Sequence, residues 1–123
     1  MVNAKLQKQY GLFIDGEFVP ASDGGTFEAH NPANGEVLAA CAEATKEDVD
    51  KAVAAARRAL ASWRHTSPIE RQNYLLKIAD IIDENAEHLA LVETLDNGKP
   101  IRETSAVDIP MGSDHFRYFA GCI

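Results

Sequence analysis

A chain of 123 residues is long enough for one domain with a modest hydrophobic core. Its hydrophobic fraction of 46% and charged fraction of 25% are typical of a globular protein and argue against an intrinsically disordered chain. The formal net charge of −7 disfavours binding to nucleic acid or to an anionic membrane, because both require a basic surface.

The N-terminal sequence MVNAKLQKQY lacks the apolar core of a secretory signal peptide, and a transit peptide would be richer in Arg and Ser. No apolar run in the sequence has the length of a membrane span. Cys41 and Cys122 lie far apart and form neither a CxxC spacing nor a disulfide framework. We therefore expect a cytoplasmic protein with two reduced cysteines, in which residues 1–11 form an N-terminal tail.

The first half of the chain has the pattern of short strands separated by turns. Residues 12–19 predict a β-hairpin, because Asp15-Gly16 between two apolar runs is typical of a type I′ turn with positive φ at both positions. Two further short strands are expected within residues 26–32 and 36–42, joined through the turn sequence NPANG.

From about residue 45 to residue 123 the pattern is helical. Thr45 and Asp48 have the spacing of a capping box at a helix N-terminus. Trp63 is expected to close this first helix and to anchor it in the core. Apolar residues recur behind the cap at helical spacing, namely Val49, Ala52, Val53, Ala56 and Leu60.

A second helical region begins at Ser67, with Pro68 as its first helical residue and Glu70 completing a capping box. It forms one long helix, or two helices with a break and a new cap at Asn85. Gly98 stands where a left-handed residue ends a helix, and a proline follows two residues later. The expected buried stripe consists of Tyr74, Leu75, Ile78, Ala79, Ile81 and Ile82.

The last helix is expected over residues 101–123, with a defect. Pro110 has no N–H to donate and Gly112 weakens the same turn, so we expect a kink there. The end of this helix is strongly apolar and needs a surface to cover Phe116, Tyr118, Phe119, Cys122 and Ile123. The predicted fold class is an α+β fragment, with a hairpin and short strands followed by three or four helices.

The residues alone provide no complete active site, so we assign no catalytic and no cofactor-binding residue. The glycines form neither a GxGxxG turn nor a P-loop. Cys41 lies among alanines and Cys122 in an apolar stretch, and both have the surroundings of packing residues more than of activated nucleophiles. The four histidines, at positions 30, 65, 88 and 115, do not have the spacing of metal ligands.

Four segments occur in a distinctive order, namely LFIDGEFV, HNPANGEVLAACAEATKEDVDKAVAAARRAL, SPIERQNYLLKIADIIDENAEHLALVETLDNGKPIRETSAVDIP and DHFRYFAGC. Together they resemble the start of an NAD(P)-dependent aldehyde dehydrogenase, over the chain from about Leu12 onward. NGKPIRETSAVDIP and DHFRYFAGC look closest to bacterial enzymes that oxidise acetaldehyde and other short aliphatic aldehydes. Met111–Ser113 departs from the resemblance, because a more apolar triplet is expected there.

The resemblance implies that residues 12–123 are an incomplete N-terminal portion of a longer enzyme and form the leading part of its cofactor-binding domain. The full-length parent would use NAD or NADP to convert aldehydes to carboxylic acids and would form a homo-oligomer, a dimer or a tetramer. The family's catalytic cysteine, general-base glutamate and nucleotide-binding glycines would lie beyond residue 123. This chain alone is then an inactive scaffold whose partner is the missing C-terminal portion.

The resemblance also implies a structural monovalent cation, K⁺ or Na⁺, near the end of the helix that carries ETLDNGKP. Asp96 would be one ligand, and the backbone oxygens of Ala29 and of His30 would be others. The alternative, that Asp96 is a plain residue of a helix C-terminal turn, has equal weight. A second reading of the whole chain is a short stand-alone protein that acts as an interaction module for a full-length subunit.

Overall fold

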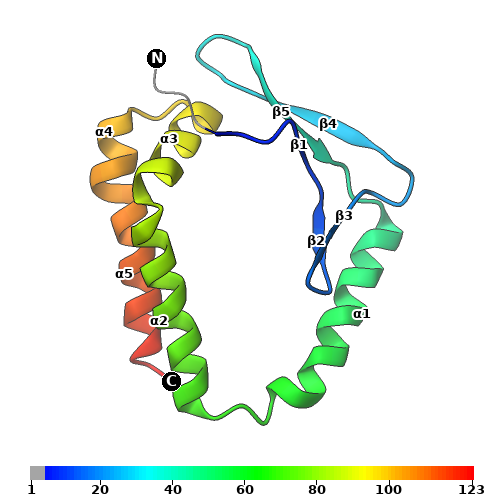
Figure 1. Ribbon diagram of the computed structural model, residues 1–123, viewed down its shortest axis with the longest axis vertical. Coiled ribbons are helices and arrows are strands. Elements are labelled where there is room, and N and C mark those ends of the chain that lie inside the picture. The colour runs from blue at the N-terminus through cyan, green and yellow to red at the C-terminus, as the bar shows by residue number, and fades with distance from the viewer. Residues whose placement is uncertain (1–4) are drawn as a thin grey trace. The chain divides into compact units, whose positions relative to one another are not determined.

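The computed structural model describes residues 5–123, which divide into two compact units at residues 65 and 66 (Figure 1). The first unit contains the five strands and helix α1, and the second contains the remaining helices. Among the described residues, no helix combines the length and the hydropathy that a membrane crossing requires. The predicted order of hairpin, strands and helices is confirmed.

Strands β2 (Leu12–Ile14) and β3 (Glu17–Val19) form the predicted antiparallel hairpin. The turn residues Asp15 and Gly16 have φ angles of 56° and 87°, as a type I′ turn requires. Phe13 and Phe18 lie opposite each other across the hairpin with ring centroids 5.0 Å apart, and both rings are largely exposed. The hairpin thus carries an aromatic pair on a face that solvent reaches.

A separate sheet has the strand order β1-β5-β4, and its three strands are labelled in Figure 1. Strands β4 (Thr26–His30) and β5 (Val37–Ala42) are antiparallel and confirm the two expected strands. Strand β1 (Gln9–Tyr10) pairs in parallel with β5, although we expected these residues to lie in a tail. Two residues are too short for an alternating pattern, so only pairing with a distant strand reveals this element.

Helix α1 (Lys46–Trp63) begins at the predicted capping box, in which the Thr45 hydroxyl accepts from the Asp48 N–H and the Asp48 carboxylate accepts from the Thr45 N–H. Trp63 ends the helix as predicted but is 45% exposed, so the expectation that it anchors the helix in the core is wrong. Within the helix, Ala55 and Asp48 are the buried residues, and the large apolar side chains of the expected stripe remain accessible.

In the second unit, α2 (Pro68–Glu84) and α3 (Ala86–Asn97) are separated at Asn85, which confirms the predicted break. The Asn85 side chain does not cap α3; its amide donates to the Ile81 carbonyl at 2.8 Å. The predicted capping box at Ser67 and Glu70 is present. Gly98 closes α3 with a φ of 80°, the left-handed conformation that was predicted for it.

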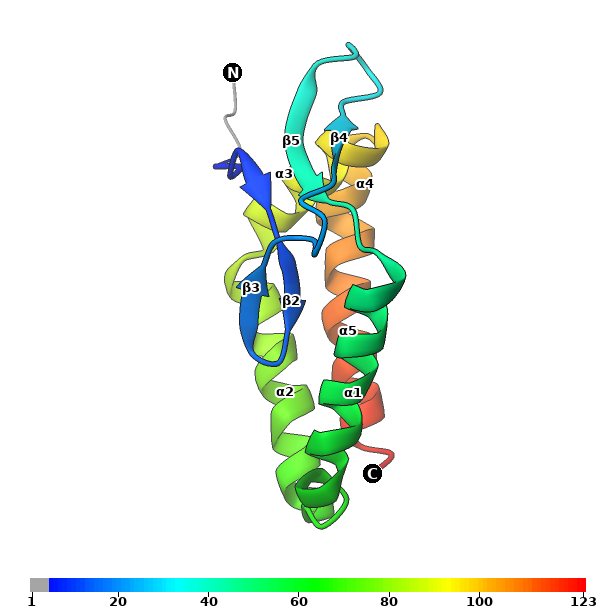
Figure 2. The same ribbon diagram turned by 90° about the vertical axis from the view of Figure 1, so that its right-hand side faces the viewer.

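Helix α5 (Ile109–Ala120) packs along α2 (Figure 1; Figure 2), and small side chains allow the two backbones to approach closely. Ala79 of α2 and Ser113 and Ala120 of α5 are buried. Arg117 of α5 reaches back to α2 and forms ion pairs with Asp80 at 3.0 Å and Asp83 at 2.6 Å. Of the expected α2 stripe, only Ala79 is fully buried, while Tyr74, Ile78 and Ile81 are exposed.

The last helix has a defect, as predicted, but it is a π-helical turn before Pro110 and not a kink at Pro110 and Gly112. A short α4 (Ile101–Glu103) leads into a π-helical turn, η1 (Thr104–Asp108), and then into α5. The Ile109 N–H donates to the Thr104 carbonyl, five residues back. In a regular helix the ring of Pro110 would collide with the carbonyl four residues earlier, which is that of Ala106 within η1. The wider π-helical turn relieves this clash. Pro110 and Gly112 themselves lie within regular helix.

Candidate functional site

Asp96, the predicted cation ligand, lies in the last turn of α3 with an exposed side chain. The helix end around it is closed by other residues: the Gly98 N–H donates to the Thr94 carbonyl at 3.0 Å, and the Asn97 side chain accepts from the Lys99 N–H at 2.8 Å. The Asp96 carboxylate makes no hydrogen bond or ion pair within residues 5–123. Its oxygens are therefore accessible to a cation or to water.

Ala29, the second predicted ligand, is half-buried in β4, where it pairs with Ala39 of β5 beside a bulge. The neighbouring His30 ring contacts Glu28 at 3.4 Å and the Gly35 carbonyl at 3.4 Å. Ala29 lies in the first unit and Asp96 in the second, so neither unit brings the two predicted ligands together. The cation site therefore stays a prediction.

The two cysteines lie in different units of the chain. Cys41 is half-buried in β5 opposite Phe27, and Cys122 is exposed just beyond α5. Both thiols are free, and the Cys122 sulfur lies 3.5 Å from the Tyr118 carbonyl oxygen. In the described part of the chain, neither thiol forms a hydrogen bond with a histidine or a carboxylate that could activate it. The structure thus places no nucleophile–base pair here.

The passage from β5 into α1 is the place where a dinucleotide-binding turn would be sought. It contains Glu43, Ala44 and Thr45 and no glycine, so the backbone cannot approach a pyrophosphate closely. The first turn of α1 is also occupied by its own acidic residues, Glu47 and Asp48, at the position where a phosphate would bind. These residues do not fit NAD or NADP.

Asp48 has the most strongly shifted carboxylate of the first unit, and its role is structural. It is 3% exposed, and one oxygen, Oδ2, accepts hydrogen bonds from the N–H groups of Thr45 at 3.0 Å and Ser22 at 3.1 Å. These backbone donors, together with both hydroxyl groups, lower the pKa of Asp48 to about 2. The carboxylate thereby joins the loop after β3 to helix α1. The hydrophobic periodicity of the sequence does not indicate that Ser22 donates hydrogen bonds to Asp48.

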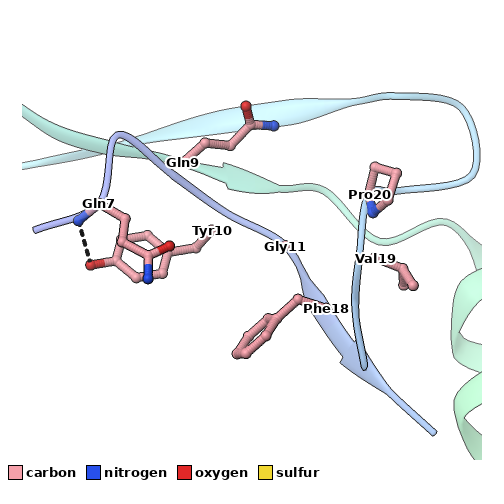
Figure 3. A pocket seen from close by; sticks show the side chains of 7 residues that line it. All are labelled: Gln7, Gln9, Tyr10, Gly11, Phe18, Val19 and Pro20. Atoms are coloured by element: carbon pink, nitrogen blue, oxygen red, sulfur yellow. Dashed lines mark hydrogen bonds between the residues drawn. The ribbon is translucent and has the colours of Figure 1, made fainter. Parts of the chain in front are cut away.

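A surface hollow of about 450 Å³ lies beside β1 and β3 (Figure 3). The Tyr10 hydroxyl on its wall accepts from the Gln7 N–H at 3.1 Å. Its lining contains no carboxylate, thiol or imidazole, so it has no group for acid–base or nucleophilic chemistry. The lining residues are Gln7, Gln9, Tyr10, Gly11, Phe18, Val19 and Pro20. Within residues 5–123, no cluster of three or more His, Cys, Asp or Glu side chains could hold a metal ion.

Comparison with known proteins then decides the family. The sequence model described as the aldehyde dehydrogenase family matches residues 18–123. The chain belongs to the aldehyde dehydrogenase family. It is 54% identical to an acetaldehyde dehydrogenase of Pseudomonas aeruginosa and 52% identical to an aldehyde dehydrogenase of Deinococcus radiodurans, in each case over 96% of this chain.

The fold agrees with that of solved aldehyde dehydrogenases. The NAD⁺ complex of the Bacillus cereus enzyme matches with a TM-score of 0.89 and 46% identity over 92% of this chain. The NAD-dependent enzyme of Sinorhizobium meliloti matches with a TM-score of 0.89 and 38% identity over 96% of this chain. The chain spans 23% of the length of both curated relatives, and 23% and 24% of the two crystallised chains. The resemblance of the sequence motifs to this family is thereby confirmed.

Proposed function

We propose that this chain is the N-terminal scaffold of an NAD(P)-dependent aldehyde dehydrogenase whose complete form oxidises acetaldehyde and other short aliphatic aldehydes to carboxylic acids. The observation that carries the proposal is the 54% identity to an acetaldehyde dehydrogenase across 96% of this chain. The described residues contribute no nucleophile–base pair and no dinucleotide turn. We therefore assign no catalytic step to them, and NAD or NADP would bind to residues that this chain does not contain.

In this proposal the residues of the chain act by holding elements in place. Asp48 fixes the start of α1 to the loop after β3, and Arg117 ties α5 to α2 through two carboxylates. Gly98 ends α3 so that the chain can turn into α4. Such rigid supports determine how accurately a catalytic site is positioned, even where they touch no substrate.

We further propose that the Asp96 carboxylate and the Ala29 backbone oxygen bind K⁺ or Na⁺ in the complete enzyme. Two features support this proposal. Asp96 stands at the C-terminal end of α3, where the partial negative charge of the helix favours a cation. Its carboxylate also makes no contact within residues 5–123 that would compete with an ion. The expected partners are the remaining portion of the enzyme and further copies of it, as a dimer or tetramer in the cytoplasm.

The test is a chimera in which this chain replaces the matching segment of the Pseudomonas aeruginosa acetaldehyde dehydrogenase. We expect the chimera to oxidise acetaldehyde with NAD and the isolated chain to show no activity above the blank. Oxidation by the isolated chain, or a folded chimera without activity, would contradict the proposal. The 54% identity over 118 residues makes the replacement conservative enough for either result to be informative.

A further inference from the structure

The sequence contains two Asn-Gly pairs, Asn34-Gly35 and Asn97-Gly98. Asparagine is a chemically labile residue. It is most labile before glycine, because the backbone nitrogen of a residue without a Cβ reaches the carbonyl carbon of the asparagine side chain with little obstruction. Both glycines have positive φ, 75° at Gly35 and 80° at Gly98, and both asparagines are exposed. Any difference in reactivity between the two pairs therefore arises from the structure that surrounds them.

The side-chain amide of Asn34 is held by Glu36 in an arrangement that favours attack on its carbonyl carbon, Cγ. Its Oδ1 accepts from the Glu36 N–H at 3.0 Å, and its Nδ2 donates to the Glu36 carboxylate at 2.9 Å. An N–H on the carbonyl oxygen stabilises the negative charge that develops there when a nucleophile adds to Cγ. The carboxylate beside Nδ2 is placed to relay to this nitrogen the proton that it needs in order to leave.

The backbone at Gly35 is held by a single acceptor. Asn34 and Gly35 lie in the turn that joins β4 to β5 and projects from the end of their sheet (Figure 1). The N–H groups of Gly35 and Asn34 both donate to the Asn31 carbonyl, at 2.7 and 3.3 Å. Release of this one carbonyl frees the Gly35 nitrogen to turn toward Cγ of Asn34. Exposed turns open locally at a low cost in free energy, so this release is frequent.

The second pair has similar side-chain contacts but a more firmly held backbone. The Asn97 Oδ1 accepts from the Lys99 N–H at 2.8 Å, and a carboxylate accepts from its Nδ2 at 3.2 Å. Asn97 is, however, the last of the 12 residues of α3, and the Gly98 N–H donates to the Thr94 carbonyl within that helix. The Lys99 ammonium is paired with Asp108 of η1 at 2.6 Å. Rotation of the backbone at Asn97 would therefore unwind the end of α3 and break this ion pair.

We propose that Asn34 is a site of spontaneous deamidation and that the fold protects Asn97 from the same reaction. The Gly35 nitrogen loses its proton and bonds to Cγ of Asn34, and the Cγ–Nδ2 bond breaks as Nδ2 takes up that proton and leaves as ammonia. The cyclic succinimide then adds one water molecule. Opening at Cγ gives aspartate, and opening at the backbone carbonyl gives isoaspartate, in which the main chain runs through Cγ. Either product adds a negative charge to the turn that already carries Glu36.

The experiment incubates the chain, and separately the chimera described above, in mildly alkaline buffer with and without guanidinium chloride. Mass spectrometry follows both asparagines in the same samples, and electron-transfer fragmentation distinguishes isoaspartate from aspartate. Without denaturant we expect Asn34 to react at least tenfold faster than Asn97. In guanidinium chloride the two rates should agree within about threefold, because each asparagine then precedes an unconstrained glycine. The matched variant is Asp108→Ala, which removes the ion pair with Lys99 and should raise the rate at Asn97 while the rate at Asn34 stays unchanged.

A tenfold difference in either protein supports the inference, provided that guanidinium chloride abolishes it. Comparable rates at the two asparagines in both proteins, or a faster reaction at Asn97, would overturn it. A difference that persists in guanidinium chloride would also overturn it, because the sequence and not the fold would then be its cause. An unchanged rate at Asn97 in Asp108→Ala would count against the protection that the ion pair is inferred to give. These outcomes do not depend on acetaldehyde oxidation, so they are independent of the proposed function.

Discussion

Replacement of Gly98 by alanine tests the account of how α3 ends. Gly98 has a φ of 80°, and an L-residue in this left-handed conformation costs about 1–2 kcal/mol because its Cβ crowds the following carbonyl. The N–H of residue 98 can still donate to the Thr94 carbonyl, so backbone strain is the main effect. We therefore expect Gly98→Ala to lower the free energy of unfolding by about 1–2 kcal/mol.

The matched control is the same substitution at Gly112. This glycine lies inside α5 with helical geometry, and a Cβ added there would meet no atom within 4 Å other than the adjacent backbone of its own helix. Gly112→Ala should raise the free energy of unfolding by about 0.5–1 kcal/mol, because alanine loses less backbone entropy in a helix. Urea unfolding followed by circular dichroism measures both variants. A Gly98→Ala variant as stable as the parent, or more stable, would refute the reasoning.

Three further predictions concern one carboxylate, one packing position and the cation. The donors around Asp48 lower its pKa from 3.8 to about 2, so its contribution to stability is complete above pH 4 and is lost as the pH falls through about 2. In urea unfolding between pH 6 and pH 2, the stability difference between the parent and Asp48→Asn should therefore shrink below pH 4; a constant difference would contradict this. Ala79→Leu should cost about 1–3 kcal/mol by overpacking the α2–α5 contact, where Ala79 has no exposed surface, and an unchanged urea midpoint would count against that packing. In the chimera, Asp96→Ala should abolish the difference in melting temperature between potassium and a bulky organic cation, and an unaltered difference would remove Asp96 as a ligand.

The sequence predicted those parts of the fold that local chemistry determines. Asp15-Gly16 gave the hairpin because few other residue pairs accept positive φ at both turn positions. Two helix N-termini could be predicted from capping boxes, at Thr45 with Asp48 and at Ser67 with Glu70. Each box satisfies backbone donors through side chains only three residues apart. Gly98 gave a helix end for the same local reason.

Features that depend on distant residues could not be predicted in this way. Strand β1 exists through its pairing with β5, and the Ser22 donors reach Asp48 across 26 residues of sequence. Periodicity identified the apolar stripes, and we expected the stripe of the second helix to be buried. Periodicity does not state which stripe finds a partner, and Val53 and Ile81 remain exposed. The candidate cation site could be predicted from the sequence even less well than the fold. Its ligands Asp96 and Ala29 were assigned only by resemblance, and they lie in different units.

The central claim, that this chain is the scaffold portion of an aldehyde dehydrogenase, is tested most directly by the acetaldehyde oxidation rate of the chimera with NAD. Three proteins are compared: the Pseudomonas aeruginosa enzyme, the chimera, and the same enzyme without the segment that matches this chain. We expect the chimera to retain a kcat within about tenfold of the parent, which corresponds to a loss of at most about 1.4 kcal/mol in transition-state stabilisation. The enzyme without the segment should be inactive. A chimera that folds cooperatively and is as inactive as the truncated enzyme would contradict the account.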